Sequence, residues 1–310
     1  MPEGFKVLGS GPLATLQDLG RPGHRSAGIP PGGAMDRFAL IAANRLVGNP
    51  DGLAALEITR GGLILKALGP ALLAVAGGEP SLRLNGSVAP AWTSFLVSAG
   101  DRISLEGMDL GERAYVAVRG GFLGQLWLGS RSTYALAGLG GLGRRLGAGD
   151  RIDRGEIAGA GVAGRRLEWG LRPQYSGHAR LRVLAGPHLE LLLPPARDQL
   201  LQSEWSLTEE CDRMGYRLRG PAMAPLATDL ASFPVTTGCV QLPPGGQPIL
   251  LMSDHPASGG YPVPVTVISA DLPLAAQLRP HDRLRLELVD LDQAAKARAE
   301  QRAALDSIRS

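Results

Sequence analysis

The sequence predicts a mostly β protein with few helices, built from two similar lobes. Gly 43 and Pro 24 together make up about 22% of the 310 residues, which indicates many turns. Apolar segments are short and have the length of strands, and a set of short motifs recurs about 180 residues further along. Hydrophobic residues account for 44% and aromatic residues for only 5% of the chain, so we expect a globular core of aliphatic side chains.

The strands are predicted from apolar runs that glycine, proline or polar residues interrupt. Such runs are rich in Val, Ile, Leu and Ala and are too short for most helices. The predicted strands lie at 63–65, 71–76, 95–97, 114–118, 181–184, 248–252, 263–268 and 284–289.

Three segments favour helices. Asp36 is a suitable N-cap for a helix over 37–47, and Gly48 follows as a stop signal. Residues 206–209 read Ser-Leu-Thr-Glu, the pattern of a capping box, and predict a short helix. The tail from Leu291 is rich in Ala, Arg, Glu and Gln and predicts a terminal helix.

An internal near-repeat predicts the division into lobes. Five pairs of segments follow one another in the same order, with offsets of 175 to 184 residues, too long a period for a solenoid. The pairs are 6–12 with 182–187, 36–37 with 212–213, 61–62 with 245–246, 77–78 with 259–260, and 100–106 with 281–287. We therefore predict a first lobe over 1–165 with a Gly- and Arg-rich extension at 138–166, a second lobe over 175–290, and a helical tail over 291–310.

Composition and motif spacing argue against several classes of protein. The net charge is only +3, and the arginines are scattered without interleaved aromatics, which argues against nucleic-acid binding. Cys211 and Cys239 lack the spacing of a zinc site or a disulfide scaffold, so no metal is predicted. No apolar run approaches 18 residues and the N-terminus does not resemble a signal peptide, so we expect no membrane association and a cytoplasmic location.

The glycine-rich stretch 138–143 literally matches GxGxxG. A dinucleotide site requires a helix directly after this motif, but Gly147 and Gly149 follow at once. We therefore expect a glycine loop that other groups can approach closely, and not a nucleotide site.

The segment 254–262 (DHPASGGYP) follows a predicted strand and places polar groups at its end. Such a segment can form a small-anion or carbonyl site from side chains and backbone N–H groups. It can equally form a tight turn whose Asp254 accepts hydrogen bonds from its own backbone. A hydrolytic triad of Asp254, His255 and Ser258 is not expected, because residues so close in sequence do not easily align.

Two further polar groups have open interpretations. Asn44 lies near the apolar face of the predicted helix, where it either satisfies the local backbone or faces a ligand. Arg21 and Arg131 lie in polar clusters beside glycine, where they either grip a carboxylate or phosphate or form structural ion pairs.

Six further segments stand out along the chain, and they lie at 15–21, 32–36, 43–49, 129–133, 213–218 and 258–262. Together, and in this order, they resemble the carboxyltransferase-type family. That family includes the second subunit of allophanate hydrolase, a region of urea carboxylase, the C-type subunit of 5-oxoprolinase and an antagonist of a sporulation-kinase inhibitor. The resemblance implies two cyclophilin-like β-barrels, in agreement with the internal repeat.

The resemblance also implies partners and an activity. It suggests a heteromer with a companion subunit of the kinase-inhibitor-like type, and in 5-oxoprolinase with a third subunit. The implied reaction is ATP-dependent opening of 5-oxoproline to glutamate, with ATP used by the complex. In urea carboxylase the similar region joins a carboxyl group from biotin to urea, but nothing here resembles a biotin-attachment segment, so biotin is not implied within this chain.

The sequence departs from the family pattern in one segment. The family commonly has Asp, a variable residue and Gln-Thr-Thr before Gly-Gly-Tyr-Pro. This chain keeps Asp254 but has Pro256, Ala257 and Ser258 at the next three family positions, so an amide and one hydroxyl are lost. A substrate-binding site depends strongly on such partners, which leaves the identity of the amide substrate open.

We therefore predict an enzyme subunit that processes a small amide or lactam, most simply 5-oxoproline. The alternatives are a urea or amide carboxyltransferase component and a non-catalytic regulatory binding partner. Asp254 and Glu57 are the candidate catalytic carboxylates. The candidate substrate-binding residues are Asp18, Arg21, Asn44, Arg131, Ser132, Gln241, His255, Ser258, Gly259, Gly260 and Tyr261.

Overall fold

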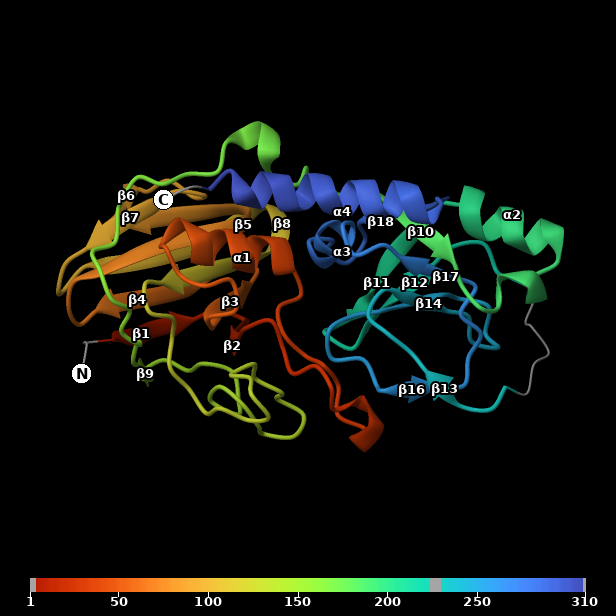
Figure 1. The fold of residues 1–310 in the computed structure, drawn as a ribbon, viewed down its shortest axis with the longest axis horizontal. Coiled ribbons are helices and arrows are strands. Elements are labelled where there is room, and N and C mark those ends of the chain that lie inside the picture. The colour runs from red at the N-terminus through yellow and green to blue at the C-terminus, as the bar shows by residue number, and fades with distance from the viewer. Residues whose placement is uncertain (1–3, 224–229, 309–310) are drawn as a thin grey trace. The chain divides into compact units, whose positions relative to one another are not determined.

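The computed structural model describes residues 4–223 and 230–308, which divide into two compact units (Figure 1). The first unit comprises Met1–Arg21, Gly32–Pro173 and Arg302–Ser310, and the second comprises Pro22–Pro31 and Gln174–Gln301. The predicted lobes ended at 165 and began at 175, whereas the observed change of unit falls at 173–174. The second unit also takes in the segment 22–31, which sequence proximity had placed in the first lobe.

The first unit is built on a nine-stranded sheet that does not close into a barrel among the described strands. Its main order is β2-β3-β8-β4-β1-β9, and β5 adds to it by pairing with β6, β7 and β8. The strands are β1 (Phe5–Ser10), β2 (Leu13–Gln17), β3 (Ala55–Thr59), β4 (Leu63–Ala67), β5 (Ala71–Leu84), β6 (Ser87–Val88), β7 (Ser94–Val97), β8 (Arg102–Val118) and β9 (Arg151–Ile152).

Helix α1 (Arg37–Leu46) packs on strands β5 and β8 of this sheet (Figure 1). Its N-cap is Asp36, whose carboxylate accepts a hydrogen bond from Ala39 N at 2.9 Å. The predicted helix and its cap are therefore confirmed. The helix buries Phe38 and Leu46 because its apolar residues recur at the helical period.

The second unit is a closed barrel of seven strands in the order β10-β17-β14-β15-β12-β11-β18. These strands are β10 (His178–Ala185), β11 (Trp205–Cys211), β12 (Gly215–Arg219), β14 (Cys239–Gln241), β15 (Ile249–Leu251), β17 (Val265–Val267) and β18 (Arg283–Leu288). All pairings are antiparallel except that of β10 with β18, which is parallel. The prediction of a mostly β fold with two β-rich lobes is confirmed.

Smaller elements complete the second unit. They are α2 (Pro194–Gln202), α3 (Leu272–Ala276) and the two-stranded ladder of β13 (Phe233–Pro234) with β16 (Ser258–Gly259). The predicted terminal helix is confirmed as α4 (Leu291–Asp306). Short 3-10 turns lie at Arg25–Ala27, Trp169–Leu171 and Leu189–Leu191.

The capping-box prediction at 206–209 is wrong. These residues lie in β11, where Trp205 and Leu207 are buried and alternate with more exposed neighbours. Period-two burial in a barrel outweighs a four-residue helix-start pattern, because the alternation places two large side chains in the core.

One corner of the internal repeat is reproduced in three dimensions. Gly100 and His281 both adopt left-handed φ angles, +93° and +73°. The aspartate that follows accepts a hydrogen bond from the backbone N–H three residues earlier in both units: Ser98 N donates to Asp101 at 2.7 Å and Arg279 N to Asp282 at 2.8 Å. The two units thus share a turn that leads into β8 in one and β18 in the other.

The glycine loop 138–143 belongs to the first unit and starts no helix, as predicted. Gly140 and Gly141 have positive φ angles, and a Cβ atom on Gly140 would lie 2.1 Å from the carbonyl oxygen of Ser132. This close backbone approach explains the glycine, since no other residue fits there.

Among the described residues, no helix is long and apolar enough to cross a membrane.

Candidate functional site

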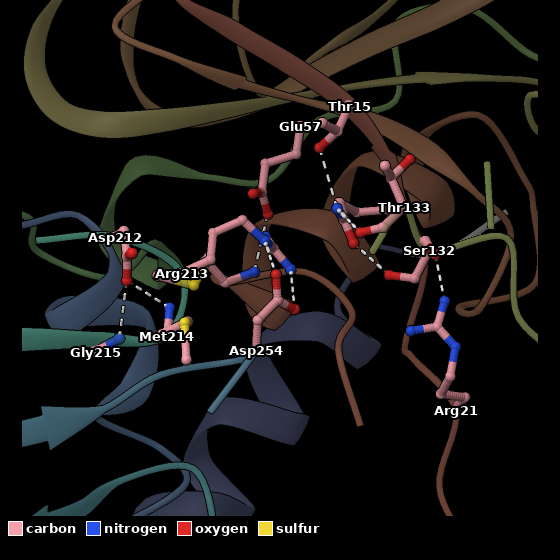
Figure 2. A network of polar contacts seen from close by, with 12 residues as sticks. Thr15, Arg21, Glu57, Ser132, Thr133, Asp212, Arg213, Met214, Gly215 and Asp254 are labelled. Carbon is pink, nitrogen blue, oxygen red and sulfur yellow. Dashed lines mark hydrogen bonds and ion pairs between the residues drawn. The ribbon is translucent and has the colours of Figure 1, made fainter. Parts of the chain in front are cut away.

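Asp254 lies just after β15 in the second unit and faces the guanidinium of Arg213. Arg213 Nε and Nη2 donate to the two carboxylate oxygens at 2.8 and 3.1 Å, a bidentate pair that Figure 2 shows. The backbone reinforces the pair, because Asp254 N donates to Arg213 O at 2.7 Å. Asp254 is only 7% exposed, so its carboxylate is held in a fixed direction by a charged partner.

The turn before β12 fixes the position of Arg213. Asp212 Oδ1 accepts hydrogen bonds from Met214 N at 2.7 Å and Gly215 N at 3.2 Å, which Figure 2 shows. Such an aspartate turn stabilises the tight approach to the strand. It sends the Arg213 side chain toward Asp254, 41 residues further along the chain.

His255 is fully buried next to this pair. Its Nδ1 lies 2.6 Å from the carbonyl oxygen of Pro256, which can only accept, so Nδ1 carries the proton. Nε2 is then an acceptor, and it has no hydrogen-bond partner among the described residues. Burial lowers the pKa of His255, and the charge of Arg25 lowers it further, so the ring is neutral at physiological pH.

Gln241 lies against Gly259, in the glycine segment that follows His255 in the sequence. It ends β14, is 6% exposed, and its Nε2 has no partner within the described residues. A Cβ atom on Gly259 would lie 2.5 Å from this Nε2, so glycine at 259 leaves the room that the amide needs. Ser258 and Gly259 form β16 against β13, whereas Tyr261 is 45% exposed.

Asp18 organises a different polar cluster, in the first unit. Its Oδ1 accepts hydrogen bonds from Gly20 N at 2.7 Å and Ser130 Oγ at 2.6 Å, and its Oδ2 accepts from Arg131 N at 2.6 Å. All three donors are uncharged. Asp18 therefore joins the loop after β2 to the loop at 129–133.

A second part of this cluster lies around Gln17. Its Oε1 accepts from Ser132 Oγ, while its Nε2 donates to Thr15 Oγ1 at 3.0 Å and to Thr133 O at 3.2 Å. Arg21 is almost fully buried, donates to Ser132 O, as Figure 2 shows, and lies over the ring of Trp127 at 4.8 Å. The structure therefore brings together two polar clusters, 17–21 and 129–133, that the sequence analysis had treated separately.

Glu57 lies on β3 beneath the loop that leads into α1. Glu57 Oε2 accepts from Met35 N at 2.9 Å and from the Tyr115 hydroxyl at 2.7 Å, and that hydroxyl accepts from Asp36 N at 2.8 Å. Burial raises the pKa of Tyr115, and the charge of Glu57 raises it further, so the phenol stays protonated. Glu57 thus orients the start of α1.

Asn44 has a structural role. Its Nδ2 donates to Asp51 O at 3.3 Å and Leu53 O at 2.8 Å, and its Oδ1 accepts from Asn49 Nδ2 at 2.9 Å. These bonds use the amide to fix the turn between α1 and β3. The sequence left two interpretations of Asn44 open. The structure favours the one in which its amide forms hydrogen bonds with the nearby chain.

Sequence reasoning had left out three residues of these clusters: Arg213, Ser130 and Tyr115. Each contacts a candidate carboxylate that is distant in sequence, by 41, 112 and 58 residues respectively. Arg213 and Ser130 both lie in segments that carry the family resemblance, and that was the available signal. No cluster of three or more potential metal ligands occurs in the described part of the chain.

Comparison with known proteins identifies the family. The family described as "carboxyltransferase domain, subdomain A and B" matches residues 27–288. The chain belongs to this carboxyltransferase domain family. Its two units agree with the two subdomains in that description.

The relatives fall into two groups. The chain is 36% identical to the 5-oxoprolinase C subunit of Haemophilus influenzae over 96% of this chain and 94% of that protein, and 36% identical to its Escherichia coli counterpart over 96% and 95%. It is 33% identical to a putative urea carboxylase of Emericella nidulans over 95% of this chain, but that match spans only 25% of the relative.

A solved structure shows the same fold. The crystal structure of K. lactis urea amidolyase matches 100% of this chain with a TM-score of 0.93 and 29% identity. The chain spans 20% of that larger protein. The relatives in the two groups are named as a subunit of 5-oxoprolinase and as larger enzymes that act on urea.

The polar clusters can support amide chemistry. A fixed carboxylate such as Asp254 can accept an N–H from an amide, and backbone N–H groups and arginines can stabilise a developing oxyanion. Ligand binding by these residues stays a prediction.

Proposed function

We propose that this chain is the C-type subunit of a 5-oxoprolinase, which opens 5-oxoproline to glutamate at the cost of ATP. The observation that carries the proposal is the 36% identity to two 5-oxoprolinase C subunits, over 94% and 95% of their lengths. Almost every segment of those two proteins therefore has a counterpart in this chain.

Within the proposal, Asp254 holds the lactam N–H and Arg213 keeps the carboxylate in position. The ring carbonyl of a lactam is a poor electrophile, so activation with ATP and stabilisation of the oxyanion are required. We assign no residue of this chain to ATP, because the glycine loop 138–143 is packed against Ser132 and starts no helix. ATP is used by the complex in this proposal, and we expect the complex in the cytoplasm.

The test is ATP-dependent loss of 5-oxoproline, measured with the purified chain and then with the chain co-purified with its kinase-inhibitor-like companion and the third subunit. We expect turnover only in the complex and only with ATP. A stable complex without turnover would overturn the proposal and favour the regulatory binding role.

A urea carboxyltransferase role is the second candidate, because the urea amidolyase structure matches the whole chain with a TM-score of 0.93. In that role this chain would transfer a carboxyl group to urea from biotin carried by another chain. The assay supplies a carboxylated biotin carrier protein and compares urea with 5-oxoproline as the amide. Carboxylation of urea together with inactivity toward 5-oxoproline would select this role.

A further inference from the structure

Two arginine side chains of the first unit meet at the end of helix α1. Arg119 directly follows β8, and Arg165 lies in the segment that pairs with the start of β7. Gly48 follows the last turn of the helix, and a Cβ atom placed on it would lie 2.8 Å from Arg119 Nη1 and 3.0 Å from Arg165 Nη1. Both guanidiniums therefore border the same point. This crowding and the φ angle of +72° together explain why position 48 holds glycine.

Arg119 is held in place by neutral acceptors. Its Nη1 donates to Val47 O at 3.1 Å and to Gly48 O at 3.4 Å. Its Nη2 donates to Ala158 O at 2.9 Å and to Gly159 O at 3.0 Å. Because all four acceptors are backbone carbonyls, they fix the guanidinium without cancelling its charge. The end of an α-helix carries about half a negative charge, which offsets only part of one guanidinium.

Arg165 has a fixed backbone but a side chain without a partner. Arg165 N donates to Ser94 Oγ at 3.1 Å, and Ser94 N donates to Arg165 O at 2.8 Å. The half-buried side chain makes no hydrogen bond or ion pair with the described part of the chain, and its Nε is buried. A partly desolvated cation beside a second cation is unfavourable, and an anion between them would relieve both.

The nearby carboxylates are already used. The carboxylate nearest to Gly48 in the sequence is Asp51, and Arg45 binds both of its oxygens at 2.7 and 2.9 Å. Glu168 pairs with Arg166 at 2.6 Å. The described residues thus supply no ion pair to either guanidinium at the end of α1, and the local field there attracts anions.

We propose that Arg119 and Arg165 bind a phosphate group, either inorganic phosphate or the phosphate monoester of a small ligand. A guanidinium presents parallel N–H donors that match two oxygens of a phosphate, and two guanidiniums favour a dianion over a monoanion. Arg165 supplies the free donors, whereas Arg119 supplies a second charge at a fixed position. The site shares no residue with the clusters around Asp18 and Asp254, and the proposal does not rest on the proposed function.

The first test is calorimetry on the full chain at about pH 7.5 and constant ionic strength, without companion subunits, 5-oxoproline or ATP. The probes are inorganic phosphate, methyl phosphate and acetate. We expect inorganic phosphate to bind with a Kd of about 1 mM, and acetate to bind at least about tenfold more weakly. Methyl phosphate distinguishes the two sources: affinity equal to that of phosphate supports a monoester, and much weaker binding supports the free anion. No binding of either phosphate at about 10 mM, or equal affinity for acetate, would overturn the proposal.

The variant Arg165→Met removes the free guanidinium and keeps much of the length of the side chain. We expect the affinity for phosphate to fall by about tenfold or more. The unfolding temperature in phosphate-free buffer should stay the same or rise, because repulsion from Arg119 is removed. The matched control is Arg166→Met, which removes the same charge from a residue already paired with Glu168 and should change the affinity by less than about twofold. Unchanged affinity in the folded Arg165 variant would refute the site.

Thermal unfolding provides a second measurement. Phosphate should raise the unfolding temperature of the wild type and of Arg166→Met, but not that of Arg165→Met, when each is compared with chloride at the same ionic strength. Arg165→Lys keeps the charge but lacks the planar pair of donors, so its affinity for phosphate should lie between those of the wild type and Arg165→Met. Equal stabilisation of the wild type and Arg165→Met by phosphate would contradict binding at this position.

Discussion

Asp18 in the first unit and Asp254 in the second are equally buried, at 7% exposure each, but their carboxylates have different kinds of hydrogen-bond partner. Asp18 accepts from three uncharged donors on two loops, whereas both oxygens of Asp254 face one guanidinium. A carboxylate bound by several backbone and hydroxyl donors holds loops together. A carboxylate that faces one side-chain cation can be shared with a ligand more easily than one held by several backbone donors. The contrast separates a structural candidate from a catalytic one.

The largest expected effect comes from Asp254→Asn. The substitution keeps the shape of the side chain but removes the charge that would hold the lactam N–H. We expect ATP-dependent turnover of 5-oxoproline by the complex to fall by about 100-fold or more. Steady-state kinetics of the complex measure this loss, and circular dichroism checks the fold.

A double variant separates chemistry from stability. Asp254→Asn leaves the Arg213 guanidinium without its carboxylate, so it also destabilises the second unit. Adding Arg213→Met should recover part of the stability but none of the turnover. Wild-type turnover in Asp254→Asn would remove Asp254 from the proposed mechanism.

Asp18→Asn is expected to act on stability. Its amide group would face donors at positions where the carboxylate now accepts, so at least one buried donor loses its partner, at a cost of about 1–3 kcal/mol. Denaturant unfolding measures this change. Ser130→Ala, which removes one of the three donors and also the acceptor of Ser132 N, should destabilise the same cluster. A stable Asp18→Asn variant with abolished substrate binding would reverse the comparison and make Asp18 the ligand-binding carboxylate.

Tyr115→Phe extends the comparison to Glu57. The hydroxyl donates to Glu57 and accepts from Asp36 N, so its loss removes one hydrogen bond from each of two buried groups and costs about 1–3 kcal/mol. The free energy of unfolding is measured by chemical denaturation. Tyr134→Phe, at a less buried tyrosine, is the control. An effect of Tyr115→Phe no larger than that of the control would mean that Glu57 does not rely on this contact.

The smallest effect concerns pH. The pKa of His255 is lower in the folded state than its ordinary value of 6.5. As the pH drops through 6.5, the unfolded chain therefore binds a proton at His255 more readily than the folded chain does, and the free energy of unfolding falls. We expect His255→Asn, which keeps a donor for Pro256 O, to reduce the loss of stability between pH 7.5 and 5.5 by about 1 kcal/mol. His178→Asn on the surface is the control. An identical pH dependence in wild type and His255→Asn would contradict a neutral buried ring.

Strands were predictable wherever aliphatic residues clustered, as at 71–76 and 114–118, because burial in a sheet requires those residues. Helix α1 was predictable because a cap, an apolar face and a stop signal agree. The failure at 206–209 arose because a local helix-start pattern competed with the burial of Trp205 and Leu207, which depends on the whole barrel. Helix α2 was missed because only Leu200 of its residues is buried, so it has little apolar periodicity.

The roles of the candidate site residues stay predictions. The family segments drew attention to Asp18, Arg131 and Ser132, but the sequence did not show that Asp18 contacts the 129–133 loop. That Arg213 pairs with Asp254, and that Gln241 lies beneath Gly259, depends on strand neighbours far apart in sequence, which a single sequence does not encode locally.

The shared turn at Ser98–Asp101 and Arg279–Asp282 has a different residue in each unit at its left-handed position, Gly100 in the first and His281 in the second. A left-handed φ suits the glycine of the first copy, but a histidine in the second copy costs about 1 kcal/mol. In exchange, His281 Nε2 lies 2.8 Å from Glu209 of β11. The first copy of the turn thus has the residue that suits its backbone, whereas the second has a side chain that contacts the neighbouring strand. If His281→Gly raises the free energy of unfolding, the relief of the backbone outweighs the loss of the contact with Glu209.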